Sequence, residues 1–156
     1  MKYSVIPMLL FIIGASLFYY TINYLEVIDW SNYLIYLEGK GIESQHGSVI
    51  ELRNLFRRGE LWNYLNSQNM YFLLTSIFMI FSGFIGFFHI VIDKFFFKKF
   101  YENPHYVRAI RRSILWGLLP VVIVAFAVQN FLITTVLLLV LFITVGMEIV
   151  ISMIWK

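Results

Sequence analysis

The stretch from residue 113 to residue 155, SILWGLLPVVIVAFAVQNFLITTVLLLVLFITVGMEIVISMIW, decides the fold of this chain. It is too long for a single membrane span, because about 20 apolar residues cross the hydrocarbon core of a bilayer. Its apolar character is interrupted in the middle at Gln129–Asn130. The stretch therefore predicts a hairpin of two transmembrane helices, over about 113–128 and 131–155. A first helix that begins earlier, near Tyr106, would give two arms of equal length, whereas a three-span alternative would need one very long tilted helix.

Glu148 is an ionisable residue inside the second arm of this hairpin. Such groups are costly in lipid and are usually either functional or paired. With the turn centred between Gln129 and Asn130, Glu148 lies level with Arg111, which is followed by Arg112. A carboxylate that faces a guanidinium satisfies both groups with paired hydrogen bonds. We therefore predict a structural ion pair inside the membrane that joins Glu148 to Arg111 or Arg112; the alternative is that Glu148 binds a proton or a cation.

Two further apolar runs precede the hairpin. The first extends from Tyr3 to about Tyr24 and predicts a first transmembrane helix within residues 1–25. Its last turns are rich in Phe and Tyr, which are typical of the membrane–water interface. The alternative interpretation is a signal peptide, because Lys2 precedes the run and small residues lie within it.

The second run extends from Met70 to about Ile92 and is rich in phenylalanine. We expect this helix to continue as an interfacial extension, so that the unit covers residues 70–102. Asn103–Pro104 would end it, because a residue that precedes proline disfavours the helical conformation. The last unit, residues 103–156, then contains a basic connection and the transmembrane hairpin.

Composition agrees with this division of the chain. Hydrophobic residues make up 60% of the 156 residues and charged residues only 13%, with no cysteine, whereas soluble domains are about a quarter charged. A soluble domain of this size could not bury so much apolar surface. The sequence thus predicts an all-α membrane protein built as a four-transmembrane-helix bundle. The absence of cysteine excludes disulfides and Cys-based metal sites, and the net charge of +3 is too small to indicate a nucleic-acid partner.

The segment 26–69 is the one sizeable polar part of the chain. Ser31 can cap a short helix, and Ser48 with Glu51 has the spacing of a capping box. Apolar and charged residues then recur at helical spacing on two opposite faces. The apolar face contains Val49, Leu52, Leu55 and Phe56, and the charged face contains Glu51, Arg53, Asn54, Arg57 and Arg58. This pattern predicts one or two amphipathic helices that lie on the membrane or over the mouth of the bundle.

The distribution of basic residues predicts the orientation in the membrane, because Lys and Arg favour the cytoplasmic side. Most of them flank the predicted spans on one side of the membrane: Lys2, Lys94, Lys98, Lys99, Arg108, Arg111, Arg112 and Lys156. We expect both termini in the cytoplasm and the segment 26–69 to be extracytoplasmic. If the source is bacterial, the membrane is the cytoplasmic membrane, since outer-membrane spans are β-barrels. Lys94, Lys98, Lys99 and Arg108 are expected to form a basic patch that faces anionic lipid headgroups, at about 1 kcal/mol per residue.

Few other residues could carry chemistry. His89 and Asp93 are four residues apart and share a helix face, but a metal ion normally takes three or four protein ligands. We therefore predict no catalytic, cofactor or metal site, with Asp93 facing headgroups or Lys94 and His89 bonded within the bundle. Two small-xxx-small patterns, which allow close helix packing, begin at Ser82 and Ser113 and end at Gly86 and Gly117.

The stretch from Met70 to the C-terminus carries a family-level resemblance. It contains a basic run over Arg108–Arg112, then Gly117, Leu118–Pro120, a short polar turn and Glu148. In these features it resembles small uncharacterised bacterial multi-span membrane proteins. The resemblance implies no activity and leaves the segment 26–69 outside it.

Three functional hypotheses follow in order of preference. The first is a non-enzymatic structural or accessory component that binds partner proteins in the membrane or forms a homo-oligomer; Trp30, Trp62, Tyr33, Tyr36 and Tyr64 in the segment 26–69 would suit such an interface. The second is a small oligomeric pore or transporter component, although the polar residues of the spans do not recur along one face. The third is a membrane enzyme with a site near His89 and Asp93.

Overall fold

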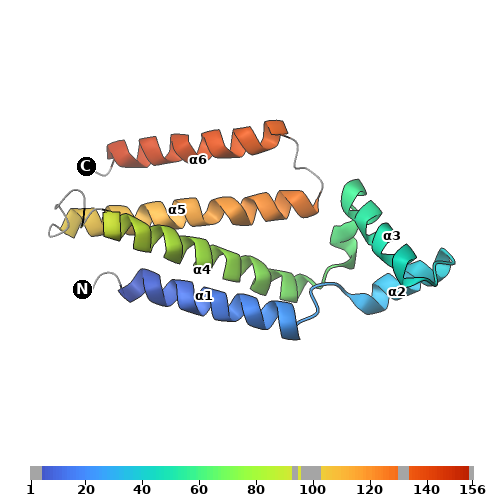
Figure 1. The fold of residues 1–156 in the computed structure, drawn as a ribbon. Helices are drawn as coiled ribbons and strands as arrows, with labels where there is room; N and C mark the ends of the chain where they lie inside the picture. The colour runs from blue at the N-terminus through green and yellow to red at the C-terminus, as the bar shows by residue number, and fades with distance from the viewer. Residues whose placement is uncertain (1–4, 93–94, 96–102, 130–133, 155–156) are drawn as a thin grey trace.

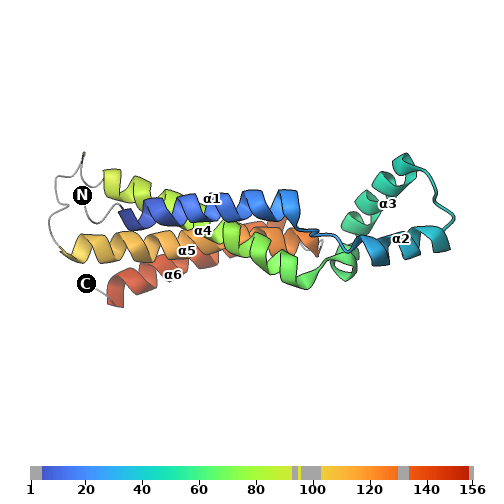
Figure 2. The same ribbon diagram turned by 90° about the horizontal axis from the view of Figure 1, so that it is seen from below.

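The computed structural model describes residues 5–92, 95, 103–129 and 134–154. Four long helices lie side by side as a bundle, and two shorter helices project past one end of it (Figure 1, Figure 2). The long helices are α1 (Val5–Tyr24), α4 (Ser67–Ile92), α5 (Asn103–Val128) and α6 (Thr134–Ile154). The short elements are α2 (Trp30–Gly39), α3 (Gln45–Arg58) and the 3-10 helix η2 (Leu61–Tyr64). The start of α1 and the end of α6 lie at the end of the bundle opposite to α2 and α3 (Figure 1).

Three of the long helices are apolar and long enough to cross a membrane. They are α1, α4 and the part of α5 from Arg108 to Val128. By the same criteria, applied to the residues that the structure describes, α6 contributes a shorter apolar segment, Thr135–Ile151. The chain thus has the all-helical architecture of the prediction, with α5 and α6 adjacent and antiparallel as the hairpin requires (Figure 1).

The boundaries of the C-terminal helices differ from the prediction at one point. α5 begins at Asn103, well before residue 113 and close to the earlier start considered near Tyr106. Pro104 lies in the first turn of α5, where a missing backbone N–H costs no hydrogen bond. Asn103–Pro104 therefore opens a helix. Apart from Phe95, the predicted interfacial extension beyond Ile92 lies outside the described residues.

The contact between α1 and α4 is so close that it needs residues without side chains. A Cβ atom added at Gly83 of α4 would lie 2.5 Å from the backbone nitrogen of Phe11 and 2.6 Å from the carbonyl oxygen of Pro7. One added at Gly14 of α1 would lie 2.7 Å from the backbone nitrogen of Ile80. Such backbone approach is how membrane helices gain packing contacts, because lipid provides no hydrophobic driving force between them.

The two small-xxx-small patterns of the sequence pack against each other where α4 meets α5. A Cβ atom at Gly117 would lie 2.8 Å from Cβ of Ser82, and one at Gly86 would lie 3.2 Å from Cβ of Ser113. The first residue of each pattern thus faces the last residue of the other, as antiparallel helices require. α4 is therefore the central helix, with α1 packed on one side and α5 on another.

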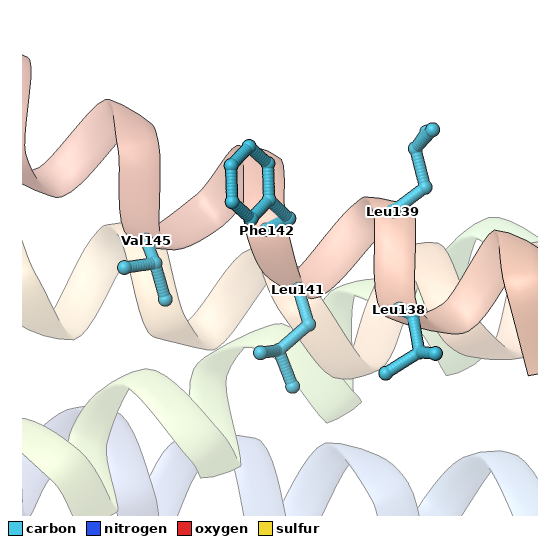
Figure 3. Close-up of a pocket in the computed structure, with 5 residues that line it drawn as sticks. All are labelled: Leu138, Leu139, Leu141, Phe142 and Val145. Atoms are coloured by element: carbon cyan, nitrogen blue, oxygen red, sulfur yellow. The ribbon is translucent and has the colours of Figure 1, made fainter.

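The outermost helix, α6, packs against α5 and leaves most of its surface exposed. Five neighbouring apolar side chains of α6 line a pocket, and Figure 3 shows that they point to both sides of the helix. They are Leu138, Leu139, Leu141, Phe142 and Val145. A surface made only of such side chains is suited to lipid tails, so the exposure of α6 is consistent with a membrane-facing helix.

Residues 26–66 form a small separate unit that we call the end module. Its buried core joins Tyr33 and Leu37 of α2 to Leu55 of α3. Around this core lie partly buried apolar side chains: Ile28, Tyr36, Ile42, Leu52, Leu61 and Tyr64. The two chain segments that connect the module to α1 and α4 run side by side, with hydrogen bonds from Asp29 N to Tyr64 O (2.8 Å) and from Asn66 N to Val27 O (2.9 Å).

Both predicted helix starts in the end module are wrong, because a better cap lies nearer to the N-terminus. Asp29, and not Ser31, caps α2: its carboxylate accepts a backbone N–H of the first turn at 3.2 Å, while the Ser31 hydroxyl donates to it. Ser44 caps α3 by accepting a backbone N–H at 3.1 Å. Ser48 therefore lies inside the helix, no capping box forms, and Glu51 is available for another role.

Candidate functional site

Glu148 belongs to a polar cluster that links three helices of the bundle. One oxygen of its carboxylate forms an ion pair with Nε of Arg112, and the other accepts a hydrogen bond of 2.7 Å from Nε1 of Trp116. On the other side, Nη1 of Arg112 lies 2.9 Å from Nε2 of His89. Because a guanidinium only donates hydrogen bonds, this ring nitrogen of His89 is the acceptor. The cluster thus runs from α4 through α5 to α6.

The position of Glu148 differs slightly from the hairpin alignment. That alignment placed it level with Arg111, whereas its carboxylate contacts Arg112 and Trp116, which lie one turn apart on α5. Arg111 instead donates a hydrogen bond of 3.3 Å to the carbonyl oxygen of Ile151. Both arginines therefore bind α6, one through a side chain and one through the backbone.

This cluster connects the helices through an ion pair and hydrogen bonds. Both carboxylate oxygens of Glu148 are engaged by donors of α5, and the side chain is only 18% exposed. In the part of the chain that the structure describes, no group of three His, Cys, Asp or Glu residues could hold a metal ion. Asp93, the suggested companion of His89, lies outside the described residues.

The predicted basic patch is described only in part. Arg108 is exposed on the first turns of α5, at the same end of the bundle as the start of α1 and the end of α6 (Figure 1). Lys94, Lys98 and Lys99 lie outside the described residues. The headgroup-binding role of these four residues therefore stays a prediction.

The end module contains a second polar network, centred on Glu51. Its carboxylate accepts hydrogen bonds from Lys40 Nζ (2.6 Å), the Tyr36 hydroxyl (2.6 Å) and Arg58 Nη2 (3.1 Å). Lys40, followed by Tyr36, lowers the pKa of Glu51 from 4.5 to about 2, because both stabilise the charged carboxylate. In return, the hydrogen bond that Lys40 donates to the Glu51 carboxylate raises the pKa of Lys40. The network ties α3 to the C-terminal end of α2.

The sequence pattern does not predict this network, because it places Glu51 and Arg58 on the face of α3 opposite to the apolar residues. The one local signal is that these two residues are seven apart, which places them on one helix face two turns from each other. Tyr36 and Lys40 come from another helix, and no local pattern relates them to Glu51. The network is a product of tertiary packing.

The apolar residues of α3 are divided between two faces, which corrects the predicted single apolar face. Leu52 and Leu55 face the core that α3 shares with α2. Val49, Ile50 and Phe56 are exposed, with Val49 at 65%. Arg53 and Arg57 are also exposed, and they lie on the same side of α3 as Val49 because they follow it by four and eight residues. We call this set, Val49, Ile50, Arg53, Phe56 and Arg57, the α3 face.

A comparable surface lies on α2. Leu34 and Ile35 are 53% and 67% exposed, and Trp30 is 44% exposed. Glu38, one turn after Leu34, is exposed beside them. We call this set, Trp30, Leu34, Ile35 and Glu38, the α2 face. Both faces belong to the part of the molecule that projects past the ends of the four bundle helices (Figure 2).

The cluster and the end module differ in what they offer to a ligand. The cluster at Glu148 is closed by its own residues, whereas the α2 face and the α3 face present large apolar side chains to the outside. Exposed apolar patches on a unit with its own core mark interaction sites. Comparison of the chain with models of protein families, with curated proteins and with solved structures found no match to any of them.

Proposed function

We propose that this protein is a non-enzymatic membrane component that acts by binding a partner protein in the same membrane through its end module. The observation that carries the proposal is the exposure of Leu34, Ile35, Val49 and Ile50 on a module that has a core of its own. Apolar side chains on both helices of so small a unit cost free energy in water. A protein partner removes this cost and gives the module its role.

In this proposal α1, α4, α5 and α6 all cross the membrane, and the end module lies on the extracytoplasmic side. The start of α1, the start of α5 and the end of α6 lie together at the other end of the bundle (Figure 1). The basic residues that flank these points in the sequence are Lys2, Lys94, Lys98, Lys99, Arg108, Arg111, Arg112 and Lys156. The preference of basic residues for the cytoplasm supports this orientation, with anionic headgroups as their neighbours.

The polar side chains of the spans favour a binding component over a pore. Buried hydroxyls donate hydrogen bonds to carbonyls of their own helices: Thr21 to Leu17, Ser76 to Leu73, Ser113 to Ile110 and Thr144 to Val140. Both carboxylate oxygens of Glu148 are engaged by α5. The hydroxyls are thus bonded to the backbone of their own helices and Glu148 is bonded to α5, which supports a structural role for these groups.

Site-specific photo-crosslinking in intact membranes tests the proposed function. A photoreactive residue is placed at Val49, at Ile35 and, as a control, at Glu43, which is exposed in the connection between α2 and α3. We expect a discrete protein adduct from Val49 and Ile35 and none from Glu43. Absence of any protein adduct at both apolar positions would overturn the proposal.

A further inference from the structure

We propose that the partner of the end module is a second copy of this chain, with the α2 face of one copy packed on the α3 face of another. This inference rests on the proposed function, because it names the protein that the module binds. The contact would bury Trp30, Leu34 and Ile35 against Val49, Ile50 and Phe56. Each face therefore contributes three large apolar side chains.

Charge distinguishes the two faces and makes them complementary. The charged residue of the α2 face is the acid Glu38, whereas those of the α3 face are the bases Arg53 and Arg57. Glu51, the acid of α3, is turned inward and held by Lys40. The α3 face is therefore basic and the α2 face acidic. Opposite charges that flank apolar patches select the partner and fix its register.

The two faces cannot meet within one molecule. α2 and α3 already pack on each other through Tyr33, Leu37 and Leu55, and through the hydrogen bond from Tyr36 to Glu51. The α2 face and the α3 face lie on the sides of these helices that take no part in the contact between α2 and α3. Because the core of the end module lies between them, the α2 face of one molecule can pair only with the α3 face of another molecule.

Anchoring in the membrane favours a second copy over a soluble protein. Every copy carries its end module at the same end of the bundle (Figure 2). Copies that share one orientation in the membrane would therefore hold their modules at the same height. Confinement to one plane and one orientation raises the effective concentration of each face for its complement. Because different faces meet, the contact gives a reciprocal dimer when both pairs of faces engage, and a ring or an open row of copies when the contact runs head to tail.

Charge reversal in the full-length protein tests the inference. The variants are Glu38→Arg, Arg53→Glu and the combination of both, with Glu43→Arg as a matched control outside the two faces. Two copies with different epitope tags are co-expressed, each with the photoreactive residue at Val49, and crosslinking between the tags is measured in membranes. We expect each single reversal to lower the yield roughly fivefold and the control to leave it unchanged.

Restoration is the decisive part of the experiment. The double variant should recover the yield, and so should a mixture of Glu38→Arg copies with Arg53→Glu copies, because each pairs an acid with a base again. A misfolded module cannot produce this recovery. If neither the double variant nor the mixture recovers the crosslinking yield, the inference is overturned.

The same adducts separate this inference from the proposed function. An adduct at Val49 with the mass of a different protein would retain a partner-binding role and overturn self-association. An adduct between two tagged copies that follows the charge pattern supports both. Absence of any protein adduct would overturn both.

Discussion

Glu148 is held by two donors of different kinds, a guanidinium and an indole N–H from the same helix. Removing Arg112 leaves the carboxylate with Trp116 alone, and His89 loses its contact with Nη1. Breaking a pair of this kind is costly, whereas replacing both members by apolar side chains of similar size is often nearly neutral. A single substitution therefore measures the cost of leaving one buried charge without its partner, and the double substitution measures the net contribution of the pair to stability.

We expect Arg112→Met to lower the free energy of unfolding by about 3 kcal/mol. The double variant Arg112→Met with Glu148→Leu should recover most of this loss. The measurement is unfolding by a denaturing detergent, followed by helicity, on the purified full-length protein. Arg108→Met, which alters an exposed residue of the same helix, serves as the control. Equal loss in the control and in Arg112→Met would contradict the structural role of the pair.

Glu51 predicts a pH dependence of the end module. Its pKa is about 2 in the folded chain and 4.5 in the absence of these partners, so its contribution is complete above pH 4.5. The contribution is lost as the pH falls from 4.5 toward 2, because in this range the unfolded chain takes up a proton at Glu51 while the folded chain does not, and this favours unfolding. Lys40 acts at the other extreme: its raised pKa gives stability that is lost when the pH rises through that pKa.

The test compares the wild type with Glu51→Gln by thermal unfolding, followed by the tyrosine signal in near-ultraviolet circular dichroism. At pH 7 the variant should melt at a lower temperature, and the difference should shrink steadily between pH 4.5 and pH 2.5. Glu43→Gln, at an exposed position in the same module, should match the wild type throughout. A difference that persisted unchanged at low pH would show that the network does not depend on the charge of Glu51.

Among the elements, α4 contributes most to the bundle because its small residues meet two helices at once. Gly83 lies against the backbone of α1, and Gly86 and Ser82 lie against α5. At Gly83 the neighbouring atoms are backbone, which cannot move aside as a flexible side chain can. A single methyl group there must separate two helices.

We therefore expect Gly83→Ala to lower the free energy of unfolding by about 1–3 kcal/mol, as overpacking does in other cores. The matched control is Gly146→Ala in α6, where an added Cβ meets no atom within 4 Å. That substitution should leave stability unchanged or raise it slightly, since alanine favours a helix. Detergent-induced unfolding of both variants measures the difference. Equal behaviour of the two would contradict the close packing of α1 on α4.

The long helices were accessible to sequence reasoning because hydropathy and chain length determine them locally. The hairpin of α5 and α6, and the two small-residue patterns, follow from spacing alone. The predicted start of α5 is too late, because a residue before proline is typical of a helix end, whereas Pro104 lies in the first turn of a new helix. Proline is tolerated both just after a helix and in the first turn of a helix, and the local sequence does not distinguish these two positions.

The end module was less accessible, because its helices are specified by each other. α3 carries apolar residues on more than one side, and only its contact with Tyr33 and Leu37 decides that Leu55 is buried and Val49 exposed. The partners of Glu51 come from α2 by the same contact. A single-helix pattern cannot predict which of two apolar stripes a second helix will cover.

For the molecule as a whole, the first question is which parts lie on each side of the membrane. The chain contains no cysteine, so single cysteines can be placed at Gln45, Asn103 and Gln129. On intact cells, a membrane-impermeant thiol reagent should label Gln45 and Gln129, because both lie at the end of the bundle that carries the module. Asn103 should react only after the membrane is permeabilised. Labelling of Asn103 on intact cells would contradict four spans with cytoplasmic termini.

The paired segments that join the end module to the bundle have a consequence for how such a protein can change over time. The chain leaves α1 and returns to α4 at neighbouring points, bridged by the hydrogen bonds Asn66 N to Val27 O and Asp29 N to Tyr64 O. An insertion whose two ends meet can be lengthened, shortened or replaced with little effect on its host, because the junction keeps its geometry. The end module can therefore change in sequence and size while the four long helices keep their packing.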